Sequence, residues 1–208
     1  DGPHMNTTRL TARTSPRGDC SDPSRSRDLR PGNCVRSLRY RSAMGTFDDL
    51  LANNRAYAET FDHPGLDSVA HSGVLMITCM DTRILTHEIL GLSFGDANII
   101  RTPGGRVARS TVAGCIVAVQ LLGVRRIMVT QHSRCAMASG DDAAIIQRIR
   151  DTRGADASKI RFGACPDQLR TMRTDVDRLR KNPLVAELAT IGGFFYDVDT
   201  GRLTQWLE

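Results

Sequence analysis

Short apolar runs alternate with stretches of helical periodicity along the chain from about residue 73 onward. Apolar runs at 73–79 and 126–131 have the length of single strands and are typical of buried strands, and a further strand is expected at 97–101. Segments with helical spacing separate them, one near 84–91 and one from 110 to 122. Strands joined through helices form right-handed crossovers, so the pattern predicts a parallel sheet with functional groups at the carboxyl ends of its strands.

The ends of two predicted helices carry recognisable signals. Ser110 is a suitable N-cap for the helix at 110–122, and Gly123 is a typical residue to end it. An earlier helix is expected to be capped by Thr46, because two aspartates follow in its first turn and complement the positive end of the helix dipole.

The remainder of the chain predicts three more helices and a hairpin. The helices are expected near 141–150, near 167–181 and directly after Pro183. The hairpin combines the segment GFFYDV, a turn at 199–201 and the segment RLTQWL. The predicted fold class is therefore α/β, with a central mainly parallel β-sheet flanked by helices, a C-terminal hairpin and a flexible N-terminal arm.

The first 43 residues differ in composition from the rest of the chain. Residues 1–5, DGPHM, are typical of the remnant of a cleaved purification tag. Residues 6–43 are rich in Arg, Ser, Thr, Pro and Gly with almost no apolar periodicity, so they bury too little surface to offset the entropy of ordering. We expect a basic, mobile arm at 1–43 and a single α/β domain at 44–208, with Met44 as a natural translation start.

The net charge of +5 belongs entirely to the arm. Residues 1–43 hold 9 Arg and 4 Asp, which leaves 19 of the 28 Lys and Arg and 19 of the 23 Asp and Glu for residues 44–208. A neutral domain gives no electrostatic reason to bind nucleic acid, and only the arm would supply non-specific contacts of that kind. The apolar runs are shorter than the roughly 18 residues of a membrane helix, so we do not expect a membrane-spanning segment. Together with the neutral charge of the domain, this leaves neither a membrane nor a nucleic acid as an expected partner.

Two cysteines and a histidine close the first and third predicted strands. Cys79 ends the run GVLMITC, and His132 and Cys135 follow the run RIMVTQ. Two thiolates and an imidazole form a soft ligand set that suits zinc and leaves one tetrahedral position open, as in catalytic zinc sites. Asp81 and Arg83 come directly after a buried strand, where isolated charges are unfavourable, so they need each other or a metal.

The other cysteines show no paired spacing that would indicate a disulfide framework. Cys115 lies on the apolar face of a predicted helix and is interpreted as a core residue. Cys20, Cys34 and Cys165 are interpreted as incidental. Free thiols together with a thiolate metal site suit a reducing compartment, so we expect a cytoplasmic protein.

The set Cys79-x-Asp81-x-Arg83 followed by His132-x-x-Cys135, with a glycine-containing loop between them, resembles the β-class carbonic anhydrases. The resemblance covers roughly residues 46–208, includes the hairpin sequence YDVDTG, and is closest to the compact microbial branch with a CMDxR motif. It implies a Zn²⁺ ion held by the two cysteines and the histidine, with the Asp81–Arg83 pair as a catalytic dyad.

The resemblance also implies an activity and an assembly. The expected activity is the reversible hydration of carbon dioxide to bicarbonate, because zinc lowers the pKa of its bound water toward neutrality and so supplies hydroxide. The expected assembly is a homodimer or a higher homo-oligomer. Two alternatives stay open: a carbonyl sulfide or carbon disulfide hydrolase of the same family, and a non-catalytic zinc-binding relative that acts as a sensor.

Two positions depart from the pattern of many members of that family. Ala136 stands where a glycine often follows the second cysteine, which leads to the hypothesis that it narrows the pocket or tilts the Cys135 thiolate. Pro103 stands in a loop that often has the sequence Asn-Ala-Gly, and we expect it to stiffen this loop and to remove an amide donor.

Overall fold

A computed structural model describes residues 46–208 of the chain. The chain divides after Thr60 into two compact units, which are described separately. The predictions for the arm at 1–43 lie outside the described residues. The predicted domain begins at Met44, whereas this division places the first helix in the first unit. The single domain at 44–208 therefore stays a prediction.

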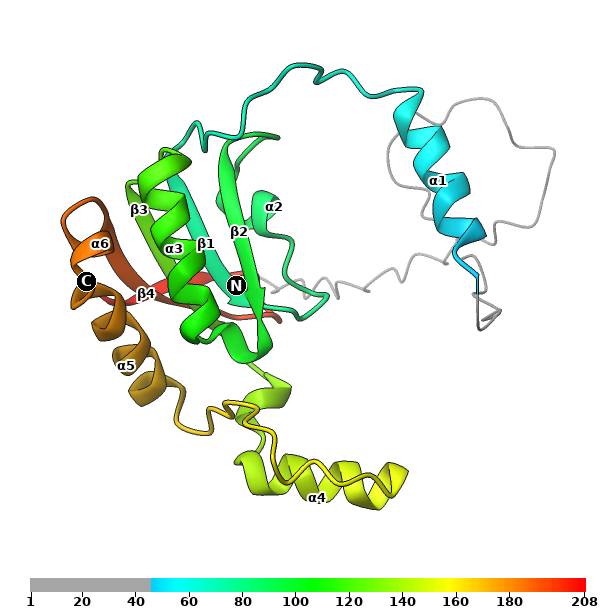
Figure 1. The fold of residues 1–208 in the computed structure, drawn as a ribbon, viewed down its shortest axis with the longest axis vertical. Coiled ribbons are helices and arrows are strands. Elements are labelled where there is room, and N and C mark those ends of the chain that lie inside the picture. The colour runs from blue at the N-terminus through cyan, green and yellow to red at the C-terminus, as the bar shows by residue number, and fades with distance from the viewer. Residues whose placement is uncertain (1–45) are drawn as a thin grey trace, which may run out of the picture. The chain divides into compact units, whose positions relative to one another are not determined.

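The described part of the first unit consists mainly of helix α1, Asp48–Ala58 (Figure 1). Its N-cap is Phe47 and not the predicted Thr46, because the first helical residue is Asp48 and Thr46 lies one position too early. The two aspartates do lie in the first turn, where they complement the helix dipole. No residue of α1 is buried, and its exposed apolar side chains include Leu50, Leu51 and Tyr57.

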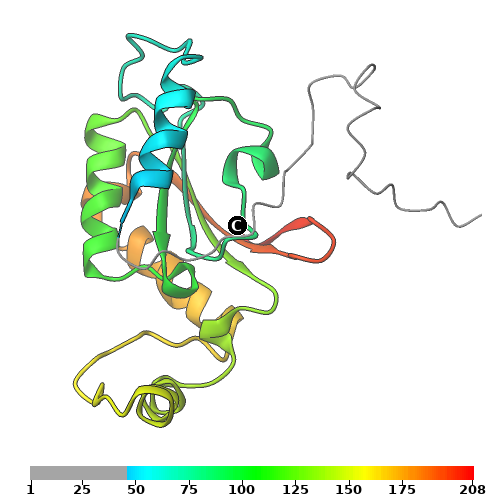
Figure 2. The same cartoon turned by 90° about the vertical axis from the view of Figure 1, so that its right-hand side faces the viewer.

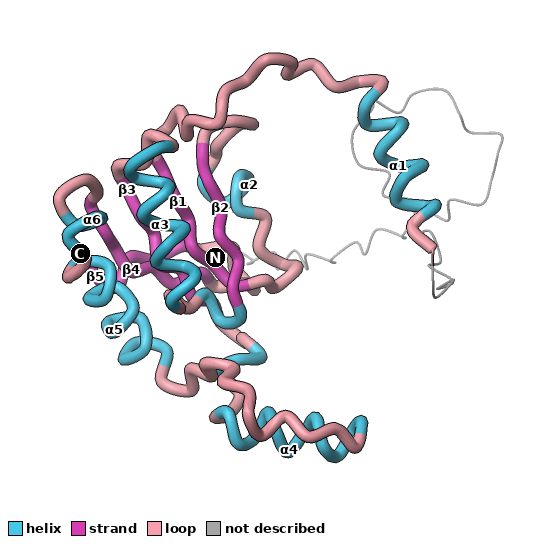
Figure 3. The backbone as a smooth tube through the Cα atoms, viewed as in Figure 1, coloured by secondary structure: helices cyan, strands magenta, loops and turns pink. Residues whose placement is uncertain are grey.

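The second unit is built around a five-stranded sheet with the strand order β2-β1-β3-β4-β5 (Figures 1 and 3). The strands are β1 Val74–Cys79, β2 Ala97–Thr102, β3 Arg126–His132, β4 Thr190–Tyr196 and β5 Leu203–Leu207. The first four strands are parallel and β5 is antiparallel to β4, which confirms the predicted α/β class with its mainly parallel sheet and C-terminal hairpin. All six residues of β1 are buried, as expected for an apolar strand with a neighbour on each side.

Helices connect the strands and cover both faces of the sheet. They are α2 Thr86–Leu90, α3 Arg109–Leu121, α4 Asp142–Arg153, α5 Gln168–Arg180 and α6 Pro183–Ala186. Helices α2 and α3 lie on opposite sides of the sheet (Figure 2), whereas α4 extends away from it and contains no buried residue. Within residues 46–208, no helix is long and apolar enough to cross a membrane.

The N-terminus of α3 differs from its prediction. The N-cap is Ala108, and the predicted cap Ser110 lies inside the helix. The hydroxyl of Thr111 accepts a hydrogen bond from the Ala108 N–H at 3.3 Å, so a side chain of the first turn takes over the role of a capping residue. The other end agrees with the prediction, since Gly123 has a φ of +73° directly after the helix.

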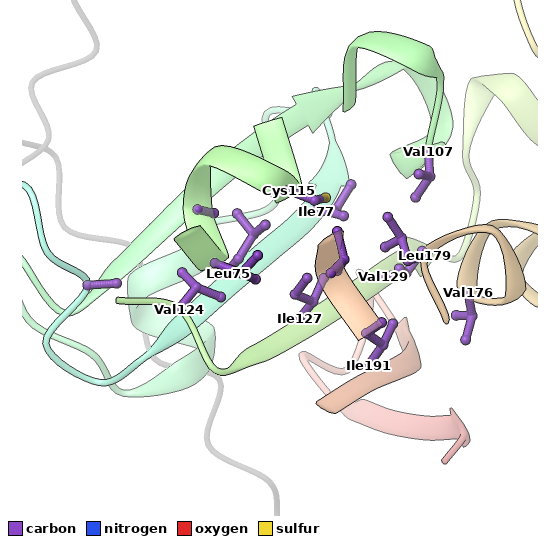
Figure 4. Close-up of a cluster of buried hydrophobic side chains, with 14 of the residues drawn as sticks. Leu75, Ile77, Val107, Cys115, Val124, Ile127, Val129, Val176, Leu179 and Ile191 are labelled. Carbon is purple, nitrogen blue, oxygen red and sulfur yellow. The ribbon is translucent and has the colours of Figure 1, made fainter. Parts of the chain in front are cut away.

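Apolar side chains of the sheet, α3 and α5 form the main core (Figure 4). Leu75 and Ile77 of β1 belong to one cluster with Ile127 of β3, and Cys115 and Leu179 join it from the two helices. Each fully buried aliphatic side chain of this size stabilises the fold by about 1.5–3 kcal/mol. Cys115 is fully buried, in agreement with its interpretation as a core residue.

A Pro-Gly-Gly turn fixes the carboxyl ends of β1 and β3. This turn, η1 Pro103–Gly105, follows β2 directly. A Cβ at Gly105 would lie 2.4 Å from the carbonyl oxygen of Thr130 and 3.4 Å from the backbone nitrogen of Cys79. Gly105 also has a φ of +66°. The turn therefore needs glycine there for both its left-handed backbone and its close approach to the strand ends.

Candidate metal centre

The predicted ligand side chains meet at the carboxyl edge of the sheet. Cys79 ends β1, His132 ends β3, and Cys135 directly precedes the short helix η2, Ala136–Ala138. All three side chains are buried, the two Sγ atoms are 4.0 Å apart, and the three ligand atoms lie within 4.8 Å of one another. Donors that surround one metal ion at bond lengths of about 2.0–2.3 Å have separations of this size.

The imidazole of His132 is oriented with one nitrogen toward the cysteines. Its Nδ1 lies 2.9 Å from the carbonyl oxygen of Ser133, and because a carbonyl only accepts, Nδ1 carries the proton. The lone pair is then on Nε2, a buried atom without a hydrogen-bond partner. The Nε2 amide of Gln168 donates to the His132 carbonyl at 2.9 Å and fixes the backbone. An orphaned nitrogen lone pair within 4.8 Å of two thiols fits a metal ion.

Asp81 and Arg83 form a bidentate ion pair beside the histidine. Arg83 Nε donates to Asp81 Oδ1 at 2.9 Å, and Nη2 donates to Oδ2 at 2.7 Å. The fork holds the pKa of the Asp81 carboxyl well below its usual range, because it stabilises the charged form. His132 Nε2 lies 3.9 Å from Asp81 Oδ2, so an ionised acceptor stands next to the ligand atoms.

Arg101 at the end of β2 fixes the backbone around the dyad, a role that sequence reasoning missed. Its Nη1 donates to the carbonyl oxygens of Cys79 at 3.0 Å and Asp81 at 3.2 Å. Its Nη2 donates to the carbonyl oxygen of Ile84 at 2.5 Å. No local pattern signals this role, because Arg101 is an exposed residue and its acceptors lie 17 to 22 residues earlier in the chain.

Cys165 lies beside the ligand cysteines, which corrects its interpretation as incidental. It is fully buried, its N–H donates to the carbonyl oxygen of Met137 at 2.7 Å, and its Sγ lies 3.0 Å from where a Cβ at Gly104 would be. The Cys165 thiol is the main cause that raises the pKa of Cys135. Sequence reasoning missed this position because the surrounding segment is irregular and is held by long-range contacts. The Asp142 carboxylate, for example, accepts from the amides of 162, 163 and 164.

The thiols of Cys79 and Cys135 resist ionisation in the absence of a cation, since the pKa of each is raised. The hydrogen bond with Cys135, followed by burial, raises the pKa of Cys79 to about 12. A bound cation reverses this preference, because a thiol that coordinates a metal is deprotonated. The donor set is therefore chemically suited to a metal ion, which would supply the positive charge that the buried sulfurs lack.

Neither of the two departures from the family pattern, Ala136 and Pro103, is itself in a strained backbone conformation. Arg134 is the only non-glycine residue with a positive φ in the described part of the chain, so Ala136 occupies a conformation open to any residue. The hypothesis that Ala136 tilts the Cys135 thiolate therefore gains no support from backbone strain. Pro103 is the first residue of η1, where a missing amide donor is tolerated.

Comparisons with known proteins place the chain in a family. The family model described as Carbonic anhydrase matches residues 74–203. A Mycobacterium tuberculosis protein named Beta-carbonic anhydrase 1 is 31% identical over 162 residues, which make up 78% of this chain and 98% of that protein. A solved carbonic anhydrase from Streptococcus mutans is 32% identical, with a TM-score of 0.72 and coverage of 79% of this chain and 99% of that chain. The chain belongs to the β-carbonic anhydrase family.

Membership of this family defines the class of enzyme but does not identify the substrate, because relatives with different substrates match the chain. A protein of Acidithiobacillus thiooxidans named Carbon disulfide hydrolase is 24% identical over 145 residues, or 60% of this chain and 72% of that protein. The family consists of metalloenzymes, and the group Cys79, His132 and Cys135 is present in this chain. The identity of the metal and of the substrate then depends on what these side chains favour chemically.

Proposed function

We propose that the protein is a zinc-dependent carbonic anhydrase that interconverts carbon dioxide and bicarbonate. The observation that carries the proposal is the Asp81 carboxylate, which Arg83 holds 3.9 Å from the unpartnered Nε2 of His132. A structural zinc site is closed by four protein ligands. Three ligands with an ionised acceptor beside them suit a metal that keeps one position for a reactant.

Zinc is the proposed metal because the donor set is soft. Cys79 and Cys135 would bind it as thiolates and His132 through Nε2, a combination typical of catalytic zinc. When bound, the metal supplies the Lewis acidity that makes water a nucleophile toward the carbon of carbon dioxide near neutral pH.

The dyad orients the polar hydrogen of the reacting water in this proposal. An ionised carboxylate accepts hydrogen bonds and donates none, so Asp81 imposes one direction on a hydroxyl group next to it. Arg83 fixes the plane of the carboxylate through two parallel hydrogen bonds. Because both oxygens are held, Asp81 is also kept from approaching the ligand atoms itself.

Carbon disulfide hydrolysis is the second candidate, because relatives with that name match the chain. Carbon disulfide is a linear molecule with an electrophilic carbon, as carbon dioxide is, so the same residues would serve both reactions. A zinc-binding sensor without turnover is the third reading. It leaves the dyad unexplained, since a purely structural zinc needs no orienting acceptor.

The deciding test is stopped-flow carbon dioxide hydration at about pH 8.5, where a water activated beside two thiolates is expected to be ionised. The zinc content of the same sample is measured, carbon disulfide hydrolysis is followed as released hydrogen sulfide, and Asp81→Asn is run in parallel. Fast hydration that the variant loses is the expected result. Sulfide release without hydration would move the assignment to the hydrolase, and full zinc with neither reaction would favour the sensor.

We also propose a homo-oligomer of at least two chains. Large apolar side chains are exposed on α1 and on the second unit, among them Phe47, Phe94, Val117 and Leu121. Helix α1 exposes several large apolar side chains and buries none, which is typical of a helix that packs against another protein surface. Light scattering during gel filtration would measure the mass, and a monomer at micromolar concentration would contradict this proposal.

A cytoplasmic location is proposed on chemical grounds. The four described cysteines are free thiols, and a site that depends on two of them needs a reducing compartment. Cell fractionation with a tagged chain tests this location, and recovery of the protein outside the cytoplasm would refute it.

A further inference from the structure

Two residues separate His132 and Cys135, and both are bound by the turn between β4 and β5. The first of them, Ser133, receives a hydrogen bond on its Oγ from the N–H of Val198 at 3.0 Å. The same Oγ donates to Asp197 Oδ1 at 3.3 Å. The hairpin turn is thus part of the scaffold that holds the segment between two proposed ligands.

The second residue, Arg134, has an unusual backbone. Its φ of 53° lies in the left-handed region, which non-glycine residues adopt rarely and at an energetic cost that surrounding contacts must offset. Its guanidinium Nη2 donates to Asp199 Oδ1 at 2.5 Å, and both side chains are more than half exposed. This ion pair ties the strained residue to the hairpin turn.

The backbone carbonyl of Arg134 connects this ion pair to the Asp81–Arg83 dyad. It accepts a hydrogen bond from Arg83 Nη2 at 3.3 Å. The same Nη2 donates to Asp81 Oδ2 at 2.7 Å. Because the backbone angles of Arg134 set the direction of its carbonyl, they also influence where the Arg83 fork lies.

We propose that Asp199 is a positioning residue for the dyad, which it reaches through Arg134. The carboxylate holds Arg134 in the left-handed conformation, the Arg134 carbonyl anchors Arg83, and the fork orients Asp81. The predicted consequence for turnover rests on the proposed function, whereas the consequence for the Arg83 fork does not.

A direct electrostatic route from Asp199 to Arg83 is the rival explanation. The pKa of Arg83 is raised mainly by its hydrogen bond to Asp81, and the charge of Asp199 adds to this effect. The two routes are separable at position 134. Glycine adopts the left-handed region without an ion pair, so Arg134→Gly removes the need for Asp199 as a backbone anchor but leaves its charge in place.

The Nε–H signal of Arg83 in ¹⁵N NMR spectra reports the fork directly, because this group donates to Asp81. The measurements use the full chain at known zinc content, and the signal is identified by its loss in Arg83→Lys. Asp199→Asn is expected to speed solvent exchange of this hydrogen and to lower kcat about three- to five-fold, the size that loss of an exposed ion pair allows. KM and zinc content should stay unchanged.

The double variant and a matched control complete the test. Asp199→Asn added to Arg134→Gly should cause no further change in the exchange rate, because glycine has replaced the anchor. Asp156→Asn breaks another exposed ion pair, with Arg150 at 4.0 Å, and should affect neither the Arg83 signal nor kcat.

Two results would overturn the positioning role. One is an unchanged Arg83 exchange rate in Asp199→Asn, and the other is a defect of equal size in the Arg134→Gly background, which would assign the effect to direct electrostatics. If the unmodified protein shows no hydration, the proposed function fails, while the exchange rates still decide the role of Asp199.

Discussion

Asp81 Oδ2 lies 3.9 Å from His132 Nε2, and both atoms are electron-rich. The carboxylate is ionised because Arg83 holds it, and the nitrogen carries a lone pair because Nδ1 is the donor of the ring. Two acceptors at this distance do not attract each other. Their arrangement beside two thiols is explained best by a cation that binds the nitrogen and the sulfurs, and by a polar hydrogen that the carboxylate accepts. The proposed metal ligands and the proposed Asp81–Arg83 dyad would have different tasks, and these tasks are separable by mutation.

Asp81→Asn is expected to keep zinc and to lower kcat by on the order of 10²–10³-fold, the range of a lost acid–base or orienting group. The amide keeps the shape of the carboxylate but presents donors where the site needs an acceptor. Stopped-flow hydration and zinc analysis on one sample measure both quantities. Asp151→Asn, on the exposed end of α4, is a control with the same chemical change. Unchanged turnover in Asp81→Asn would remove this carboxylate from the mechanism.

Arg83→Ala is expected to raise the pKa of Asp81 toward its ordinary value of about 3.9, because the fork is the main cause that lowers it. A carboxyl whose pKa is depressed in the folded state stabilises the fold above its unfolded pKa, and this contribution is lost as the pH falls. The variant should therefore lose stability at pH 7, and its difference from the unmodified chain should shrink below about pH 4.

Carboxyl ¹³C titration and urea unfolding at both pH values measure these effects of Arg83→Ala. Arg83→Lys serves as the comparison, since it keeps the charge but not the two parallel hydrogen bonds. An Asp81 pKa that stays equally low in both variants would show that another group holds the carboxylate ionised.

Cys79→Ser and Cys135→Ser are each expected to weaken zinc binding by more than about 100-fold, since even residues that only orient ligands account for 10–100-fold in metal affinity. Competition with a chromogenic chelator measures the affinity. Cys115→Ser is the matched control, because this thiol is also buried but belongs to the main core. Near-stoichiometric zinc retained by both serine variants would refute the assigned ligand set.

The elements that periodicity defines are those that could be predicted from the sequence. Apolar runs marked β1 and β3, and the ends of these strands placed Cys79 and His132 at one edge of the sheet. Helix caps were less predictable. At the start of α3, for example, the N-cap Ala108 has no polar side chain, and its N–H instead donates to the hydroxyl of Thr111 in the first turn of the helix. Local patterns predict which elements form, whereas contacts with neighbouring residues determine where each element begins.

Contacts between distant segments account for what the sequence did not reveal about the site. Arg101 reaches back 22 residues to the Cys79 carbonyl, and no local pattern encodes that distance. Cys165 arrives beside Cys135 through an irregular segment whose path depends on hydrogen bonds to the Asp142 carboxylate. Such positions follow from the packed fold, so only the proposed ligands and the proposed dyad, which lie next to strand ends, could be named from the sequence.

Gly105→Ala is expected to destabilise the fold by about 3 kcal/mol or more and to lower zinc affinity, because the new methyl group would overlap a backbone carbonyl of β3. The Cβ would lie 2.4 Å from the Thr130 carbonyl oxygen and 3.4 Å from the backbone nitrogen of Cys79, so relief of the overlap would shift backbone close to Cys79. Gly201→Ala separates this overlap from backbone strain, since Gly201 has a φ of +70° but nothing within 4 Å of its Cβ position. That control should lose only about 1–2 kcal/mol, the usual penalty for a left-handed non-glycine residue. Urea unfolding and zinc titration of both variants measure the difference, and equal destabilisation with unchanged zinc affinity would show that the Pro-Gly-Gly turn does not hold the strand ends at the metal centre.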